Sequence, residues 1–214
     1  ARLQTGLRTF GTAELIRPPF NRRLVMWDLN YFKYCFLRPM EAIFDEARLE
    51  DDFERMATDM TGCDQRLWGF MYRDCQSRNV MVRRGLPYWI DFQGGRPGPM
   101  AYDMASLLWQ ARAGFSDNFR KEMLGVYARE VESLRGIPAR ETEESIYNIV
   151  PLRVLQTLGA YGFRGLTQRK EHFLKSIGTG IRTLHSLAYK GVLDRYPEIK
   201  NISEELWNKQ TNQC

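Results

Sequence analysis

Residues 72–79 of this 214-residue chain read YRDCQSRN, and residues 90–95 read IDFQGG. Within these two stretches, Asp74, Asn79 and Asp91 carry oxygen atoms that can hold a metal ion or accept a proton. A single aspartate in a loop is more often a helix cap or a turn former than a catalyst. Whether the three residues can act together depends on how the chain between them folds.

The chain around these residues has the pattern of short β-strands. Apolar runs at 67–71, 79–83 and 87–92 predict strands, and Gly85 predicts a turn that joins the last two as a hairpin. A hairpin doubles the chain back, so Asp91 is expected to return close to Asn79. The sequence therefore predicts a small β insert that gathers these two side chains.

The rest of the chain is predicted to be helical. Apolar residues at helical spacing predict helices over 21–37, 49–60, 102–112, 116–134, 140–162 and 168–189, with a final amphipathic piece at 202–207. The aromatic residues of the first helix, Trp27 included, are expected to lie in the core. Residues 1–20 contain Pro18 and Pro19 and predict an extended segment. The fold class is mostly α with a small β-hairpin insert, in one domain over 21–214.

The two stretches resemble the H-R-D-L-x-x-x-N catalytic loop and the D-F-G segment of protein kinases and their small-molecule relatives. The chain looks most like the aminoglycoside phosphotransferase-like group, and within it the sugar kinases that phosphorylate the anomeric hydroxyl of N-acetylmuramate and N-acetylglucosamine. Tyr72 replaces the usual His, and Gln93 replaces the usual Gly. The resemblance implies an ATP-dependent phosphotransferase with a protein-kinase-like fold.

The resemblance also implies roles for individual residues. Asp74 would accept or orient the proton of the acceptor hydroxyl, and Asn79 and Asp91 would bind Mg²⁺ that is shared with ATP. Asp103 would begin a helix beneath the catalytic loop and accept hydrogen bonds from the loop backbone. Arg73 would brace the loop, although a solvated surface arginine is an equal alternative.

Five residues are candidates for binding the acceptor: Asp28, Arg78, Gln156, Tyr161 and Arg164. Each has a structural alternative. Arg78 can equally be a surface arginine, and the small residues around Gln156–Arg164 can equally serve close packing of helices. Cys75 is expected to be a small buried filler rather than a nucleophile, because no histidine lies near it in the sequence.

The resemblance covers one half of such an enzyme. About 20 residues precede Asn21, and they contain no Gly-rich phosphate loop and no V-A-I-K strand. We therefore expect this chain to be the C-terminal lobe, with residues 1–20 leading from an N-terminal nucleotide lobe that is absent here. That lobe of the same protein is an expected partner, and the chain alone is expected to be inactive.

Composition narrows the class of partner. The net charge is +5 and the pI is about 9.1, but basic and acidic residues are interleaved, which disfavours a nucleic-acid partner. A basic lobe also favours a neutral or anionic acceptor over an aminoglycoside or choline, which remain alternatives. No apolar run spans a membrane, and scattered cysteines fit a cytoplasmic protein. A non-catalytic kinase-like binding module is the alternative of another class.

Overall fold

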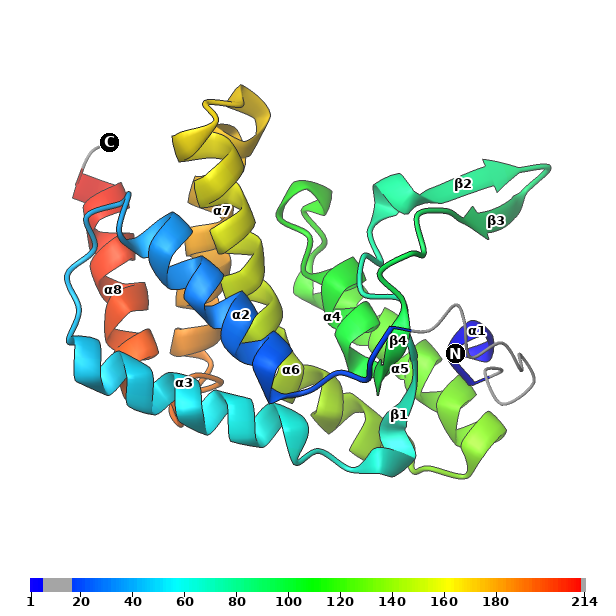
Figure 1. Ribbon diagram of the computed structural model, residues 1–214. Helices are drawn as coiled ribbons and strands as arrows, with labels where there is room; N and C mark the ends of the chain where they lie inside the picture. The colour runs from blue at the N-terminus through cyan, green and yellow to red at the C-terminus, as the bar shows by residue number, and fades with distance from the viewer. Residues whose placement is uncertain (6–16, 213–214) are drawn as a thin grey trace. The chain divides into compact units, whose positions relative to one another are not determined.

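The computed structural model describes residues 1–5 and 17–212. Contacts divide the chain into two compact units. The first unit comprises Ala1–Phe20 and Cys63–Val150, and the second comprises Asn21–Gly62 and Pro151–Cys214. Figure 1 identifies the elements of both units. The described residues are mostly helical, with two small antiparallel strand pairs, which confirms the predicted class.

The predicted hairpin is present in the first unit. β2 (Val80–Arg83) pairs with β3 (Leu86–Trp89), and Val80 lies opposite Trp89. Arg84 and Gly85 form the turn, both with positive φ (52° and 75°). Two left-handed residues in succession match the twist of a two-residue hairpin turn. The hairpin therefore closes where the sequence predicts.

The strand predicted over 67–71 is present, but its pairing partner was not predicted. β1 (Trp68–Met71) pairs with β4 (Arg96–Pro99), with Gly69 opposite Gly98. The sequence of β4 is RPGP, and proline cannot donate to a ladder, so this stretch looks like a loop. In a two-stranded sheet the proline nitrogens can face away from the partner strand. The carbonyl of Pro97 also accepts a bond of 2.8 Å from the Phe20 amide.

Among the described residues, four α-helices belong wholly or partly to the first unit. They are α1 (Arg2–Thr5), α4 (Ala101–Leu108), α5 (Asp117–Arg135) and α6 (Ala139–Tyr161), the last of which continues into the second unit. The predicted helix over 116–134 is confirmed, because Ser116 caps it and Gly136 ends it with a left-handed backbone. Residues 2–5 are helical where extended chain was predicted, and residues 6–16 of that segment lie outside the described residues.

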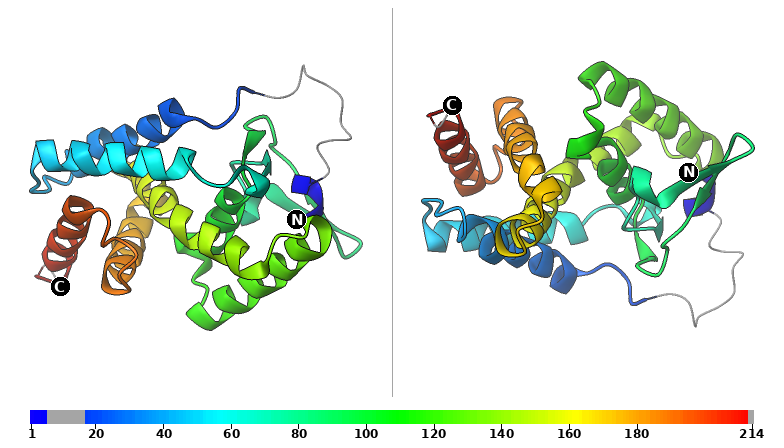
Figure 2. Two further views of the ribbon diagram at one scale, coloured as in Figure 1. Left: turned by 90° about the horizontal axis from the view of Figure 1, so that it is seen from below. Right: turned by 90° about the horizontal axis from the view of Figure 1, so that it is seen from above.

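The described part of the second unit, up to residue 212, contains four further α-helices and two π-helical turns. The helices are α2 (Arg22–Phe32), α3 (Glu46–Thr61), α7 (Glu171–Tyr189) and α8 (Pro197–Asn212), and the turns are Lys33–Leu37 and Gly162–Thr167. Figure 2 shows α2 beside α3, and α7 beside α8. Phe32, Phe36 and Phe53 are fully buried in this unit.

The prediction that Trp27 is a core residue was wrong. The buried stripe of α2 runs through Val25, Leu29 and Phe32, at the spacing of one helix face. Trp27 lies two residues after Val25 and so faces a different direction. Its side chain is 66% exposed.

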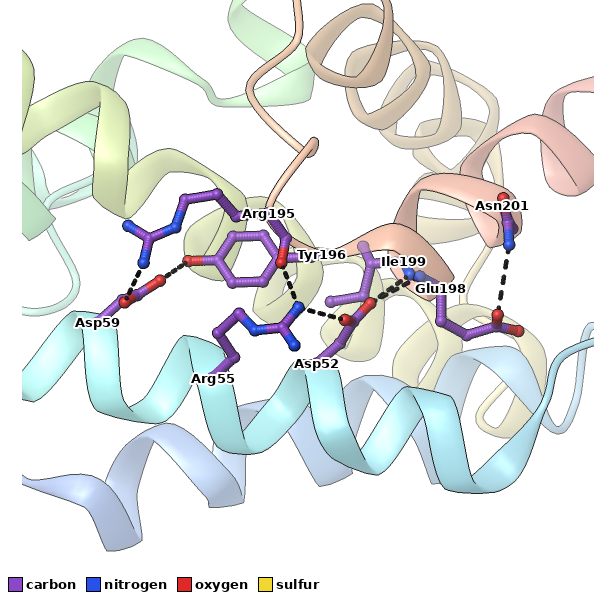
Figure 3. A network of polar contacts seen from close by, with 8 residues as sticks. All are labelled: Asp52, Arg55, Asp59, Arg195, Tyr196, Glu198, Ile199 and Asn201. Carbon is purple, nitrogen blue, oxygen red and sulfur yellow. Dashed lines mark hydrogen bonds and ion pairs between the residues drawn. The ribbon is translucent and has the colours of Figure 1, made fainter.

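The last helix begins five residues earlier than predicted. Asp52 on α3 is 1% exposed and accepts hydrogen bonds from the amides of Glu198 (2.8 Å) and Ile199 (3.0 Å), as Figure 3 shows. These amides belong to the first turn of α8, which has no partners within the helix. Pro197 occupies the first helical position, where its missing N–H costs nothing. A carboxylate far away in the sequence thus fixes where α8 starts.

Among the residues that the structure describes, no helix is both long and apolar enough to cross a membrane.

Candidate active site

The loop at residues 72–79 leaves β1 through a strained backbone. Tyr72 is buried, and Arg73 has a φ of 72°, in the left-handed region that costs a non-glycine residue about 1–3 kcal/mol. Such a conformation persists when its surroundings hold it. Asp91, in the second stretch of interest, also has a left-handed backbone, with a φ of 68°.

Asp103 holds the strained part of the loop. It lies in the first turn of α4 and is 3% exposed. Its Oδ2 accepts a bond of 2.8 Å from the Tyr72 amide, and its Oδ1 accepts one of 2.9 Å from the Arg73 amide. These are the backbone bonds expected of Asp103. They hold the backbone N–H groups of the two residues that precede Asp74.

Asn79 closes the other end of the loop. Its Nδ2 donates to the carbonyl of Asp74 at 2.9 Å, and its side chain is 5% exposed. It ends a 3-10 turn, Ser77–Asn79, whose first amide and hydroxyl both donate to Oε1 of Gln110, at 3.1 Å and 3.0 Å. The loop is therefore fixed at both ends, with the partly exposed Asp74 side chain between them.

The hairpin brings the second stretch back to the first. The Ile90 amide donates to the carbonyl of Asn79 at 3.0 Å, so Asp91 follows a residue bonded directly to Asn79. Gly94 lies against the loop as well: a Cβ built on it would be 3.7 Å from Oδ2 of Asp74. The loop that carries Asp74 and Asn79 therefore lies beside the stretch that carries Asp91.

Tyr72 links the loop to the end of the hairpin and to residue 90. Its ring packs against Trp89 at 5.7 Å between centroids, and its hydroxyl donates to the carbonyl of Ile90. Burial, and after it the charge of Asp91, raises the pKa of Tyr72 to about 12. The phenol stays protonated at neutral pH and remains a donor. An aromatic residue in place of histidine therefore still links the loop to residues 90–95.

Two of the residues that follow Asp91, Gln93 and Gly95, make close contacts. The Nε2 of Gln93 donates to Oδ1 of Asp91. A Cβ on Gly95 would be 2.3 Å from Cζ of Phe70, which only glycine avoids. Cys75 is buried, in agreement with its prediction as a filler, and Arg78 is exposed on the 3-10 turn.

The other candidate residues for the acceptor lie in the second unit. Asp28 is buried on α2, Gln156 accepts a hydrogen bond from Nη1 of Arg153, and Tyr161 packs on Phe173. The guanidinium of Arg164 lies 5.3 Å from the centre of the same Phe173 ring.

The glycines beside these residues serve close helix packing. A Cβ on Gly159 would be 2.9 Å from the amide nitrogen of Phe32, and one on Gly162 would be 2.0 Å from the carbonyl of Cys35. The small residues around 156–165 therefore let backbone approach backbone. This supports the packing alternative for the glycines, and leaves an acceptor role for Asp28, Gln156, Tyr161 and Arg164 as a proposal.

Sequence reasoning missed two glutamines that touch the loop network. Gln110 accepts both hydrogen bonds from Ser77, and Gln4 donates to Oδ2 of Asp103 at 2.8 Å. No local pattern marks either residue, because each meets its partner across 33 or 99 positions of sequence. Only the tertiary structure brings these partners together.

Asn79 and Asp91 carry oxygen atoms of the kind that a magnesium ion binds. The amide nitrogen of Asn79 is used on the carbonyl of Asp74, which leaves Oδ1 as its acceptor atom. Asp91 adds an exposed carboxylate, one residue after Ile90, which is hydrogen-bonded to Asn79. Two hard oxygen donors that leave room for phosphate and water are the kind of set that Mg²⁺ takes.

Comparison with known proteins gives two matches. The model of the phosphotransferase enzyme family matches residues 18–137, which is more than half of the chain. The N-acetylmuramate/N-acetylglucosamine kinase of Neisseria meningitidis serogroup B (strain ATCC BAA-335 / MC58) is 32% identical over 78 residues. That match covers 36% of this chain and 23% of the relative, so the chain spans about a quarter of the relative's length.

Proposed function

The chain belongs to the phosphotransferase enzyme family, and from this premise we propose that the intact protein transfers the γ-phosphoryl group of ATP to a hydroxyl of a small molecule. Family membership implies a protein-kinase-like fold. The observation that carries the proposal is that the loop with Asp74 and Asn79 lies beside the stretch with Asp91. Two hydrogen bonds join them, from Asn79 to the carbonyl of Asp74 and from the Ile90 amide to the carbonyl of Asn79.

Asp74 is the proposed catalytic residue. Phosphoryl transfer needs an acceptor hydroxyl held in line, and a carboxylate that accepts or orients its proton. Asp74 has the required exposure, and its loop is fixed on one side by Asp103 and on the other by Asn79. A group held in this way needs little reorganisation when the acceptor binds.

Asn79 and Asp91 are the proposed holders of Mg²⁺, which would neutralise charge on the phosphate groups when bound. Arg73 and Asp103 are proposed supports. Residues 21–214 are proposed to form the metal- and acceptor-binding lobe, with the nucleotide lobe of the same protein as its partner.

An acylated amino sugar is the proposed acceptor. The relative from Neisseria is named for N-acetylmuramate and N-acetylglucosamine, and the pI of about 9.1 favours a neutral or anionic acceptor over a cationic one. Asp28, Arg78, Gln156, Tyr161 and Arg164 are the candidates for contacting it.

The test is a transfer assay on the intact protein with γ-labelled ATP and Mg²⁺. Parallel reactions contain N-acetylmuramate, N-acetylglucosamine, unmodified sugars, an aminoglycoside or choline. We expect a labelled product with the acylated amino sugars, and its loss when a chelator removes Mg²⁺. A product with the aminoglycoside or choline alone would overturn the acceptor class. Binding of Mg²⁺–ATP without transfer to any acceptor would favour a non-catalytic binding module instead.

A further inference from the structure

The side chain of Gln4 reaches Asp103 from outside the loop and its helix. It lies on α1 and is 6% exposed. Its Nε2 donates to Oδ2 of Asp103 at 2.8 Å and to the carbonyl of Met100 at 3.1 Å. Its Oε1 accepts from the hydroxyl of Tyr127 at 2.6 Å. Both ends of the amide are therefore in use, and all partners are buried.

The partners determine which way the amide points. A carboxylate and a carbonyl can only accept, so the NH₂ group must face Asp103 and Met100. The remaining amide oxygen faces Tyr127, whose pKa is raised by burial and, after that, by the charge of Asp103. Tyr127 thus stays a protonated donor. The three side chains form a chain of hydrogen bonds that ends on one oxygen of Asp103.

That oxygen also holds the catalytic loop. Oδ2 of Asp103 accepts from both Gln4 and the Tyr72 amide, while Oδ1 accepts from the Arg73 amide. Removing the Gln4 donor would take away one of the hydrogen bonds that orient this carboxylate. The left-handed backbone of Arg73 depends on the carboxylate keeping its place.

The backbone of α1 is fitted to this position. A Cβ on Gly69 of β1 would be 2.4 Å from the carbonyl oxygen of Gln4, so only glycine allows the approach. The strand that leads into the loop therefore has the residue that lets α1 lie against it. Gln4 reaches Asp103 because of this contact.

We propose that Gln4 is a positioning residue for the catalytic loop, which orients Asp103 and through it the backbone that carries Asp74. The proposal rests on the phosphotransferase function proposed above. The proposed role requires no contact between Gln4 and the reacting atoms. Its contribution is to the geometry and charge of Asp103.

The first measurement is amide hydrogen exchange of the intact protein. In Gln4→Leu we expect exchange at Tyr72 and Arg73 to become at least about tenfold faster, because their acceptor is no longer held in place. Gln210→Leu, which removes a half-buried glutamine amide from α8, is the matched control and should leave these two amides unchanged. Unchanged exchange at both amides in Gln4→Leu would overturn the proposal. This readout does not depend on whether the protein is active.

The second measurement is the pH dependence of kcat in Gln4→Glu. An ionised carboxyl at this position cannot donate to Asp103, whereas a protonated one can. Asp103 and Tyr127 contact this side chain, Cys75 and Arg135 lie near Tyr127, and Arg2 on the same helix is paired with Glu130 of α5. Because the position is buried beside Asp103, we expect the pKa of the introduced glutamate to be raised. We expect the ratio of variant to wild-type kcat to be about 0.1 at pH 8 and to rise toward one as the pH falls. KM for the acceptor should change little.

Gln65→Glu is the matched control for charge, because it adds the same group at an exposed position of the same unit. A kcat ratio for Gln4→Glu that is flat with pH would contradict the positioning role. If Gln4→Glu does not fold, Tyr127→Phe removes the next donor of the chain and should speed exchange at Tyr72 and Arg73 a few-fold. A wild-type protein that transfers phosphate to no acceptor would refute the proposed function, and the exchange data would still decide the role of Gln4.

Discussion

Asp103 in the first unit and Asp52 in the second make the same kind of contact with the backbone, but the backbone they hold serves different roles. Each is a buried carboxylate that accepts hydrogen bonds from two consecutive backbone amides. The amides held by Asp103 belong to the loop that carries Asp74. Those held by Asp52 begin α8, as Figure 3 shows. The same contact supports the candidate site in one unit and only the packing of helices in the other.

The two carboxylates differ in how their oxygens are used. Asp103 offers both oxygens to N–H donors, Oδ1 to Arg73 and Oδ2 to Tyr72. Asp52 offers Oδ2 to both backbone amides, while its Oδ1 lies 3.6 Å from Nη1 of Arg55. An amide can imitate the second arrangement with its single oxygen but not the first. Substitution by asparagine should therefore be disruptive at position 103 and well tolerated at position 52.

The largest effect is expected at Asp103. In Asp103→Asn, an NH₂ group faces an N–H donor in either orientation of the amide, so one loop amide loses its acceptor. We expect kcat of the intact protein to fall about 10- to 100-fold, because a hydrogen bond to a charged group is worth about 1.5–3 kcal/mol. Steady-state kinetics checks this, with the exposed Asp51→Asn as control. A kcat within twofold of wild type would mean that Asp103 does not position the loop.

The next effect is on stability. Asp52→Ala leaves two amides of the first turn of α8 without their acceptor, and we expect the free energy of unfolding to fall by about 2–3 kcal/mol. Denaturant titration measures this change. The kcat of the folded variant should stay within about twofold of wild type. A loss of kcat as large as that of Asp103→Asn would show that Asp52 also supports the candidate site, contrary to the distinction drawn between the two carboxylates.

The smallest expected effect is the pH dependence of the free energy of unfolding in Asp52→Asn. Burial, more than any neighbour, raises the pKa of Asp52 above its ordinary value of 3.8. Above pH 3.8 the folded state therefore binds more protons at this group than the unfolded state, so its contribution to stability falls as the pH rises. Asp52→Asn lacks this titration and keeps an oxygen for both amides.

We expect Asp52→Asn to change the free energy of unfolding by less than about 1 kcal/mol. Relative to wild type, the variant should gain stability as the pH rises from 3.8 toward neutrality. Denaturant titrations at several pH values give the comparison. A stability difference that moves the other way would show that the backbone amides stabilise the ionised form of Asp52 more than burial penalises it.

The sequence predicted well those features that depend on local pattern. Residues 72–79 and the hairpin through Gly85 need only motif spacing and turn chemistry, and the predicted helix over 116–134 has its cap and its terminal glycine within its own residues. Features that depend on distant partners were missed. β4 was missed because a strand of two prolines is recognisable only once β1 lies beside it.

The start of α8 and the contact of Gln4 with Asp103 show the same limit. Asp52 caps α8 from 146 positions away, and Gln4 meets Asp103 across 99 positions. Neither pair leaves a periodic or composition signal that a single sequence can reveal. Asp103 itself was predicted because the family motif includes it, whereas its partner on α1 lies outside any motif.

The role of Asp74 is tested most directly by the single-turnover rate of γ-phosphoryl transfer in the intact protein. Wild type and Asp74→Asn are compared with saturating ATP, Mg²⁺ and the acceptor found in the transfer assay, so that the rate reports chemistry rather than binding. If Asp74 accepts or orients the acceptor proton, the rate should fall about 10²- to 10⁴-fold in the variant. An unchanged rate in Asp74→Asn would show that Asp74 neither accepts nor orients the acceptor proton.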